Sequence, residues 1–258
     1  MTPSTPTPKR KGRVVRRVQR LALLAGALFV LISLYLPINR IGIVSAPQGI
    51  SLPRVLSRIF PGVPRVGLQI GHFEVHNHPK ELAALRKNTG GSVEGLHEVA
   101  LNRAVARELK TILEARGIEV DLLPATIPPR YRADLVLSIH ADASDDLERR
   151  GYKSAHFIPA RNRAEPELKR AVDGTYLAMS GLPDDHENVT RSMFNYYAFN
   201  HRRYHHSVRR TTPGLIVELG YISNYEDRSF LEDPSRPAEA LAAGIITYLE
   251  QRGRLIGN

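Results

Sequence analysis

The chain has 258 residues and no cysteine, and 42% of its residues are hydrophobic. This length suits one domain of about 150 to 200 residues with an additional segment, and the hydrophobic content excludes a disordered protein. The lack of cysteine excludes a disulfide framework, a thiolate nucleophile and a cysteine-ligated zinc site. Any zinc must therefore be held by His, Asp or Glu.

The net charge of +10 is concentrated at the N-terminus. Residues 1–20 contain no acidic residue but seven basic ones, which are Lys9, Arg10, Lys11, Arg13, Arg16, Arg17 and Arg20. The rest of the chain therefore carries only +3. This distribution indicates a basic tail rather than a nucleic-acid-binding domain.

The tail is followed at residues 21–38 by an uncharged segment of 18 residues, LALLAGALFVLISLYLPI. That length is at the lower limit of a membrane-spanning helix and exceeds the usual signal-peptide core of about 7 to 15 residues. We expect a single-pass anchor in the cell membrane, with residues 1–20 as a cytoplasmic tail and the following domain extracytoplasmic. The alternative is a signal peptide cleaved near Ser45 and Ala46, which would give a secreted protein.

The remaining chain divides into a linker at residues 39–62 and a domain at residues 63–258. The linker contains several prolines and little periodicity, with a short helix predicted around Val55–Ile59. Strands alternate with helices in the domain, which predicts an α/β layered fold with a mostly parallel sheet flanked by helices. In chain order, the predicted elements are a strand at Arg65–Ile70, a short helix at Lys80–Arg86, a helix at Leu96–Arg116, strands at Ile118–Leu122, Ala133–Ile139 and Tyr152–Ile158, a helix at Glu165–Met179, a strand at Gly214–Val217 and a helix at Pro237–Gln251.

Four polar residues lie where these elements begin or end. His72, His140 and Glu218 follow the ends of three predicted strands, and Glu98 lies in the first turn of a predicted helix. Ligands of parallel sheets gather outside the carboxyl ends of the strands. We therefore expect these four side chains to lie close together, although a strand-capping role for His72 or a helix-dipole role for Glu98 would explain either residue alone.

Two imidazoles and a carboxylate make a three-ligand zinc site that leaves one position open for water. Zinc lowers the pKa of such a water to about 7, and a separate carboxylate can carry its proton to a departing amine. His72, Glu98 and His140 are thus candidate metal ligands and Glu218 is the candidate proton carrier. Hydrolysis of an amide or a similar acyl bond is the predicted reaction.

The same four segments resemble the zinc-dependent N-acetylmuramoyl-L-alanine amidases of the amidase-3 type, over about Val66 to Leu249. The resemblance rests on four motifs, which are Gly71-His72, Glu98 with Asn102, the run from Ser138 to Ala141, and VELGYISN from Val217 to Asn224. It implies that His72, Glu98 and His140 hold Zn²⁺ and that Glu218 is the catalytic acid/base. The implied substrate is the peptidoglycan amide between N-acetylmuramic acid and L-alanine.

This sequence departs from the family pattern at two places. The loop after His72 reads Phe73-Glu74-Val75-His76, which is bulkier and offers competing metal groups, and Asp142 stands where Asn is usual. The basic, aromatic segment Asn195–Arg210 could contact the glycan and stem-peptide carboxylates, or could simply be a solvated loop. Its composition also suits single-stranded nucleic acid, which an extracytoplasmic location argues against.

Two other functions fit the sequence. A non-catalytic peptidoglycan-binding module would explain the altered loop after His72. Another zinc hydrolase of the cell wall, a carboxypeptidase or a deacetylase, would use the same residues. Only the products of the reaction distinguish the latter from an amidase.

Overall fold

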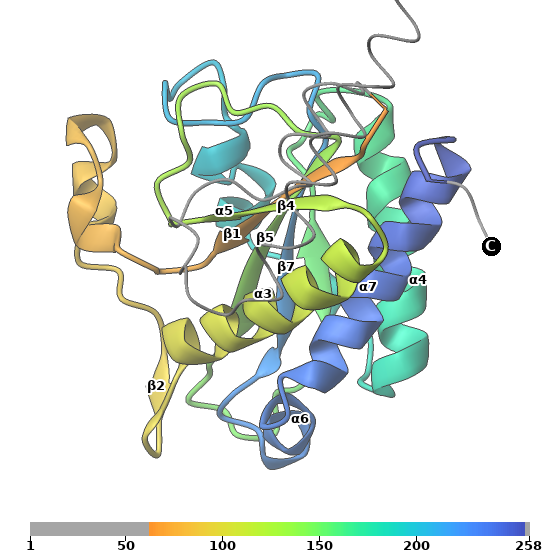
Figure 1. Cartoon of the computed structure of the whole chain (residues 1–258). Coiled ribbons are helices and arrows are strands. Elements are labelled where there is room, and N and C mark those ends of the chain that lie inside the picture. Colours follow the sequence, from red (N-terminus) through yellow and green to blue (C-terminus); the bar gives the residue numbers. More distant parts are fainter. Residues whose placement is uncertain (1–61, 256–258) are drawn as a thin grey trace, which may run out of the picture. The chain divides into compact units, whose positions relative to one another are not determined.

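A five-stranded sheet forms the centre of the computed structural model, which describes residues 62–255 (Figure 1). Across the sheet the strands are β4 (Glu119–Leu123), β1 (Arg65–Ile70), β5 (Leu135–Asp142), β7 (Gly214–Tyr221) and β6 (Lys153–Ala155). The first four are parallel, and β6 is antiparallel to β7. The expectation of a mostly parallel sheet is therefore confirmed.

Helices and short turns connect the strands. The α-helices are α3 (Glu98–Ala115), α4 (Ala164–Ser180), α5 (Arg191–Phe194), α6 (Tyr225–Leu231) and α7 (Ser235–Gln251). The 3-10 helices are η1 (Val75–Asn77), η2 (Lys80–Leu85), η3 (His186–Asn188) and η4 (Tyr197–Phe199), and a small hairpin is formed by β2 (Ser92–Val93) and β3 (Leu96–His97).

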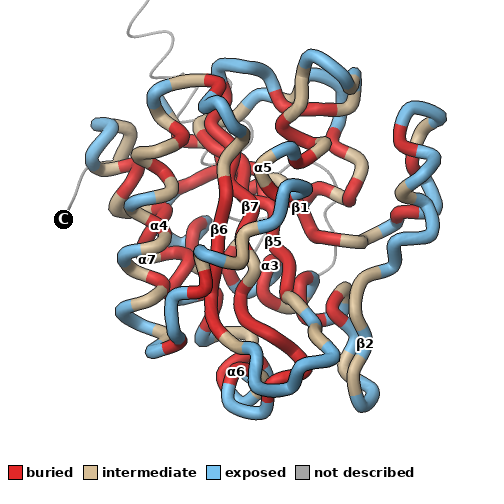
Figure 2. Tube along the Cα trace, turned by 180° about the vertical axis from the view of Figure 1, so that it is seen from behind, coloured by how far each residue is buried: buried red, intermediate tan, exposed pale blue. Residues whose placement is uncertain are grey.

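The sheet is covered on both faces, because successive side chains of a strand point to opposite sides. On β5, Leu135, Leu137 and Ile139 join the core formed with α3, α4 and α7. Val136 points the other way, into a smaller core that contains Phe199 and the segments around α5 and η4. Figure 2 shows β5 and β7 buried in the middle, with exposed segments outside.

The order of the strands determines where the site lies. From β1 the chain passes through α3 to β4 on one side of β1, and then crosses to β5 on the other side. The connections thus diverge between β1 and β5, where a crevice opens outside the carboxyl ends of a parallel sheet. His72 follows β1, and His140 lies near the end of β5.

Several predicted boundaries were wrong. Residues 96 and 97 form β3 rather than the start of the long helix, which begins at Glu98, and the predicted strand Tyr152–Ile158 is reduced to Lys153–Ala155. Residues 80–85 form a 3-10 helix, and α5 and α6 were not predicted. The strands β5 and β7 extend to Asp142 and Tyr221, so His140 and Glu218 lie inside strands rather than after them.

A side-chain cap defines the start of α6. The Asn224 side chain accepts hydrogen bonds from the backbone N–H groups of Glu226 and Asp227. This cap fixes the path of the chain directly after β7.

The expected tail at residues 1–20, the apolar segment at residues 21–38 and all but the last residue of the linker at residues 39–62 lie outside the described residues. Within residues 62–255, no helix combines the length and apolar character needed to cross a membrane. The membrane anchor therefore stays a prediction.

Candidate metal centre and its surroundings

Three side chains from separate elements converge at the carboxyl end of the sheet. We refer to His72, Glu98 and His140 as the histidine cluster. Oε1 of Glu98 lies 3.3 Å from Nε2 of His72 and 3.2 Å from Nδ1 of His140. One ligand atom from each residue lies within 4.8 Å of the other two, and no other such group occurs in residues 62–255. The cluster can hold a metal ion.

Glycines allow the three side chains to approach each other. A Cβ atom at Gly71 would lie 2.6 Å from Nδ1 of His140, and one at Gly90 would lie 2.7 Å from a carboxylate oxygen of Glu98. The backbone of His72 has a φ of 61°, in the left-handed region that non-glycine residues rarely adopt. Strained backbone of this kind is concentrated at functional sites.

Each histidine is oriented by the ring nitrogen that faces away from Glu98. Nδ1 of His72 donates to the carbonyl oxygen of Asn88 at 2.8 Å, which leaves a lone pair on Nε2. Nε2 of His140 lies 3.0 Å from the hydroxyl of Tyr196, where it can donate and leave the lone pair on Nδ1. Such partners set the tautomer of metal-binding histidines.

The electrostatics of the cluster keep Glu98 ionised. Burial alone would raise the pKa of Glu98, but the hydrogen bonds and positive charges that His140 and His72 supply when protonated together outweigh it and lower the pKa. The carboxylate also accepts from the backbone N–H of Gly91 at 2.9 Å and from the Asn102 side chain at 3.2 Å. Its place in the first turn of α3 further favours a negative charge.

The two histidines respond differently to the same carboxylate. Burial lowers the pKa of His140, so this ring is neutral at neutral pH. Burial is the largest influence on His72 as well and opposes its charged form, but the hydrogen bond and negative charge of Glu98, with the hydrogen bond to Asn88, together outweigh it and raise the pKa. His140 is more deeply buried than His72, which accounts for the difference.

Glu218 lies on β7 directly beside His140 on β5, since the two residues are partners in the strand register. Both line a cleft of about 530 Å³, together with His72 and Asp142. Burial raises the pKa of Glu218 well above its usual value, and the charges of Asp142 and Glu98 add to this effect. No described residue donates a hydrogen bond to its carboxylate.

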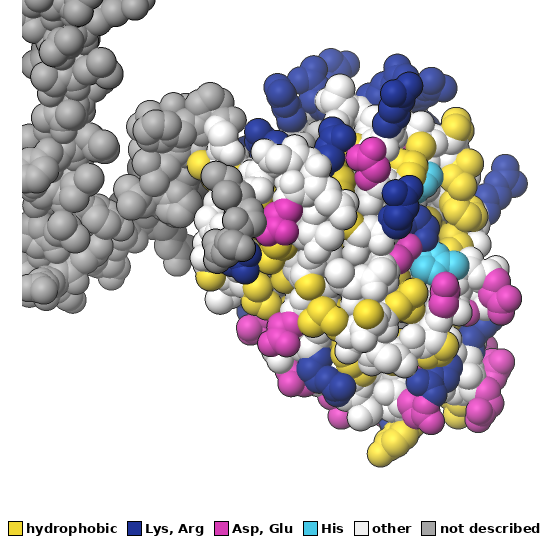
Figure 3. Space-filling model, turned by 90° about the vertical axis from the view of Figure 1, so that its right-hand side faces the viewer, with side chains coloured by type: hydrophobic (Ala, Val, Ile, Leu, Met, Phe, Trp, Pro, Cys, Tyr) yellow, Lys and Arg dark blue, Asp and Glu magenta, His cyan; other side chains and the backbone are white. Residues whose placement is uncertain are grey.

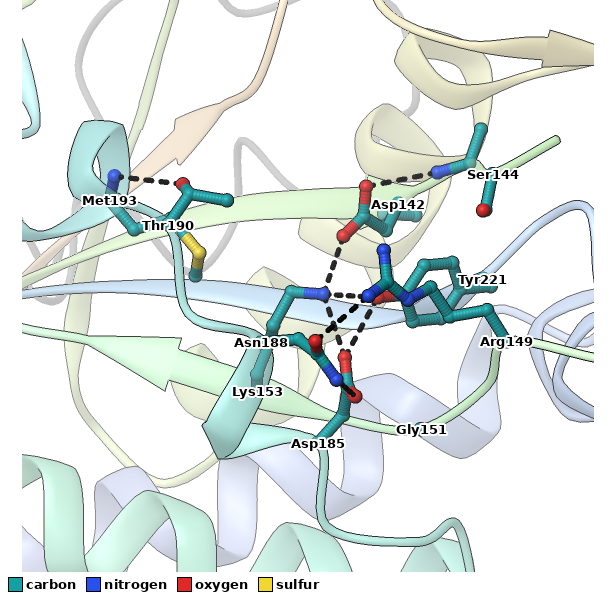
Figure 4. A network of polar contacts seen from close by, with 12 residues as sticks. Asp142, Ser144, Arg149, Gly151, Lys153, Asp185, Asn188, Thr190, Met193 and Tyr221 are labelled. Atoms are coloured by element: carbon teal, nitrogen blue, oxygen red, sulfur yellow. Dashed lines mark hydrogen bonds and ion pairs between the residues drawn. The ribbon is translucent and has the colours of Figure 1, made fainter. Parts of the chain in front are cut away.

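A second polar group, which we call the lysine cluster, lies on the other side of Glu218. It comprises Lys153, Asp142, Asp185 and Tyr221 (Figure 4). The ammonium of Lys153 contacts Asp142 at 2.7 Å, Asp185 at 2.8 Å and the hydroxyl of Tyr221. Lys153 is only 2% exposed and is the register partner of Glu218 on β6.

The lysine cluster explains the unusual Asp142. Burial would lower the pKa of Lys153, but hydrogen bonds to Asp142 and Asp185 outweigh it and raise the pKa, so the side chain stays cationic. The extra negative charge at residue 142 is therefore paired inside the protein. The sequence analysis missed Lys153 and Asp185, although a lysine inside a predicted strand was a sign of a buried partner.

The loop after His72 adds no further ligand. Glu74 and His76 are exposed and lie outside the histidine cluster. The segment Asn195–Arg210 instead contributes the Tyr196 contact to His140, which the sequence did not reveal. Four other residues of this segment, Asn195, Tyr197, Arg203 and Tyr204, line the same cleft.

Solved structures with this fold are found among peptidoglycan amidases. An N-acetylmuramoyl-L-alanine amidase from Clostridium difficile 630 is 18% identical, with a TM-score of 0.54, and the match covers 74% of this chain and 100% of that one. The amidase Ami1 from Mycobacterium smegmatis is 17% identical, with a TM-score of 0.54 and coverage of 73% and 97%. The catalytic domain of CwlV from Bacillus (Paenibacillus) polymyxa var. colistinus is 19% identical, with a TM-score of 0.50 and coverage of 73% and 99%.

At these identities the structural matches establish the fold. A search of curated proteins gives no significant match. A family model described as N-acetylmuramoyl-L-alanine amidase matches residues 71–247, which is well over half of the chain and includes both polar clusters. The chain therefore belongs to the amidase-3 family of N-acetylmuramoyl-L-alanine amidases.

Proposed function

We propose that this protein hydrolyses the amide bond between N-acetylmuramic acid and L-alanine in peptidoglycan, with Zn²⁺ as its cofactor. One observation carries the proposal, which is that His140 of the histidine cluster and Glu218, a carboxyl with a raised pKa, lie side by side on neighbouring strands and line one cleft with His72. Membership of the amidase family supports the same reaction.

The donor set of the histidine cluster fits zinc. Nε2 of His72, Nδ1 of His140 and a carboxylate oxygen of Glu98 are the nitrogen and oxygen ligands that catalytic zinc sites use, and three protein ligands leave a position for water or substrate. When bound, zinc would act as a Lewis acid and make water a better nucleophile at neutral pH. Asn88 and Tyr196 would hold the two rings in the orientation required.

Glu218 is the proposed proton carrier. Its ionised carboxylate would take a proton from the water that attacks the lactyl carbonyl, and would then give this proton to the departing nitrogen of L-alanine. A raised pKa brings the carboxyl closer to neutral pH, where one group can both accept and release a proton. The lack of a fixed hydrogen-bond partner leaves the carboxylate free to face the substrate.

We further propose that residues 21–38 anchor the protein in the cell membrane, with the domain on the extracytoplasmic side where peptidoglycan lies. Support comes from the uncharged segment and the basic residues before it. Secretion after cleavage near Ser45 and Ala46 is the alternative. N-terminal sequencing of the mature protein and fractionation of cells would distinguish the two.

The central test is digestion of purified peptidoglycan by the full-length protein, followed by mass analysis. We expect free lactyl groups and new N-terminal L-alanine with zinc, and loss of both with a chelator or in Glu218→Gln. Products cut elsewhere in the stem peptide or at the acetyl groups would identify a carboxypeptidase or a deacetylase. Binding without any product, insensitive to chelator, would identify a non-catalytic module and contradict the proposal.

A further inference from the structure

Five exposed arginines line a hollow of about 460 Å³ next to the catalytic cleft. We call them the arginine wall, and they are Arg130, Arg202, Arg203, Arg209 and Arg210. Figure 3 shows Lys and Arg side chains gathered at the upper end of the domain, where Figure 1 places the loops before β5 and β7. This concentration of positive charge lies outside the basic tail that dominates the sequence.

Main-chain contacts hold the arginine wall in place. Tyr131 and Val208 form an isolated β-bridge, and the N–H of Arg209 donates to the carbonyl of Tyr131 at 2.9 Å. Val208 is fully buried in the smaller core. The side chain of Glu81 accepts from the backbone N–H groups of His205 at 2.9 Å and His206 at 2.8 Å. The backbone segments that carry these arginines are therefore held in place by hydrogen bonds and by packing.

No arginine of the wall is paired with an acid among the described residues. Elsewhere in the domain, by contrast, Arg65 contacts Glu119 at 2.6 Å and Arg254 contacts Asp134 at 2.7 Å. The guanidinium of Arg210 reaches only a backbone carbonyl, and that of Arg203 lies over the Tyr204 ring. Uncompensated charges of one sign raise the local concentration of anions.

The one acid that lines this hollow, Glu81, is ionised and offsets only part of the positive charge of the five arginines. Burial would raise the pKa of Glu81, but hydrogen bonds from the backbone of His205 and His206 outweigh it and lower the pKa to about 2. The carboxylate is therefore engaged by N–H groups of the loop and by the His206 ring at 2.7 Å. A ligand that supplies carboxylates meets five guanidinium groups and one carboxylate, Glu81, that is already hydrogen-bonded to the loop.

The wall is continuous with the catalytic cleft. Arg203, Tyr204 and Glu81 line both the hollow and the cleft that contains His72 and Glu218. A substrate whose scissile bond lies at the histidine cluster can therefore extend along the cleft to the wall. The wall favours an anionic part of the substrate at this end of the cleft and repels a cationic one.

We propose that the arginine wall binds the free carboxylates of the peptidoglycan stem peptide and so orients the substrate with its peptide, rather than its glycan, towards Arg203. This inference rests on the function proposed above. The N-acetylated glycan backbone is uncharged where its lactyl groups are amidated, whereas the stem peptide carries carboxylates. Arginine forks match carboxylates in geometry as well as in charge.

The test compares two soluble muropeptides, one with free stem carboxylates and one with those carboxylates amidated. We expect the wild-type protein to prefer the free acid in kcat/KM, and we expect Arg202→Gln/Arg209→Gln and Arg203→Gln to reduce this preference by about three- to twentyfold, the effect of losing one or two partly exposed ion pairs. The control Arg170→Gln removes an exposed arginine on α4, against the other face of the sheet, and should keep the preference.

A binding experiment gives an independent readout. In Glu218→Gln protein, affinity for a fluorescent free-acid muropeptide should fall with added salt, and it should fall less steeply in Arg202→Gln/Arg209→Gln. Equal preference for both muropeptides in active wild-type protein would overturn the inference while leaving the amidase proposal intact. Loss of binding to anionic phospholipid vesicles in the variants, with unchanged muropeptide preference, would also overturn it. Failure of the wild-type protein to release any product would instead count against the proposed function.

Discussion

The two polar clusters on either side of Glu218 differ in what completes them. The lysine cluster contains its own cation, since the ammonium of Lys153 lies between the carboxylates of Asp142 and Asp185. The histidine cluster contains no Lys or Arg, and its two rings and one carboxylate face each other through atoms that can each bind a metal ion. Buried polar groups are normally satisfied within the protein. The lysine cluster is therefore a structural network, whereas the donor atoms of the histidine cluster suit an added cation.

Glu218 belongs to neither cluster, but charged residues of both clusters shift its pKa. Its neighbour across the sheet on one side is His140, and on the other side it is Lys153. The negative charges of Asp142 and Glu98 raise its pKa, and Lys153 opposes them. The position between two clusters thus supplies both the burial and the charge environment that a proton carrier requires.

The largest expected effect comes from removing the charge at the centre of the histidine cluster. Glu98→Gln keeps the shape and most hydrogen bonds of the side chain but removes the anionic ligand. We expect zinc content after dialysis to drop to background and hydrolysis to fall by more than about 1,000-fold, because in the proposed reaction zinc would activate the water and polarise the carbonyl. Asp185→Asn makes the same chemical change in the lysine cluster.

That matched variant sharpens the comparison. Asp185→Asn should retain stoichiometric zinc, measured by elemental analysis, because Asp185 lies outside the group of candidate ligands. If both variants lost zinc equally, the two clusters would form one site and their separation here would be wrong.

Breaking the lysine cluster should act on stability. Lys153→Met leaves Asp142 and Asp185 without their cation, and we expect the free energy of unfolding to fall by about 3 to 5 kcal/mol, as for other broken buried pairs. Denaturant titration measures the loss. The double variant Lys153→Met/Asp185→Asn should recover part of it, because one uncompensated charge is removed with its partner. A double variant as unstable as the sum of both single changes would contradict this.

The parallel sheet and the approach of the candidate site residues His72, His140 and Glu218 could be predicted, because each residue stands near the end of an apolar run. Apolar runs end near His72 and His140, and carboxyl ends of parallel strands meet at one edge. Glu218 was placed after its strand because a charge usually ends an apolar run. Pairing with His140 and Lys153 instead continues the strand through Glu218 to Tyr221.

The rest depended on contacts that no local pattern encodes. Lys153 and Asp185 are 32 residues apart, and Tyr196 is 56 residues from His140. The hairpin of β2 and β3 has two residues in each strand, too few for a detectable alternation. Side-chain partners of this kind are decided by how loops pack on the finished sheet, and the sequence shows only that polar residues are present.

A smaller effect is expected from the residue that orients His140. Tyr196→Phe removes the hydroxyl that lies 3.0 Å from Nε2, while the ring can still fill the same space. Loss of an orienting partner typically weakens metal binding by about 10- to 100-fold. Competition with a chromogenic zinc chelator measures this change. Tyr197→Phe is the control, since its hydroxyl bonds the carbonyl of Ala125 at 2.6 Å and not a candidate ligand. Equal losses in both variants would show that general packing, rather than ring orientation, is responsible.

The smallest expected effect is a difference between the two clusters in how they respond to pH. Asp185 has a lowered pKa, so its stabilising contribution is present above the pKa of an unfolded aspartate, near 4, and is lost as pH falls through the lower folded value. Lys153 has a raised pKa, so its contribution is present below about 10.5 and is lost only as pH rises beyond it. The lysine cluster is therefore insensitive to pH between about 5 and 9.

The histidine cluster should respond to pH in this range, because zinc must displace a proton from His72, whose pKa is raised. The affinity for zinc should fall by up to about tenfold for each pH unit below that pKa. Thermal unfolding with and without zinc at pH 7.5 and 5.5 should show that the increase in Tm caused by zinc shrinks at the lower pH. A zinc effect that is equal at both values would show that His72 does not compete with protons for the metal, and would remove it from the ligand set.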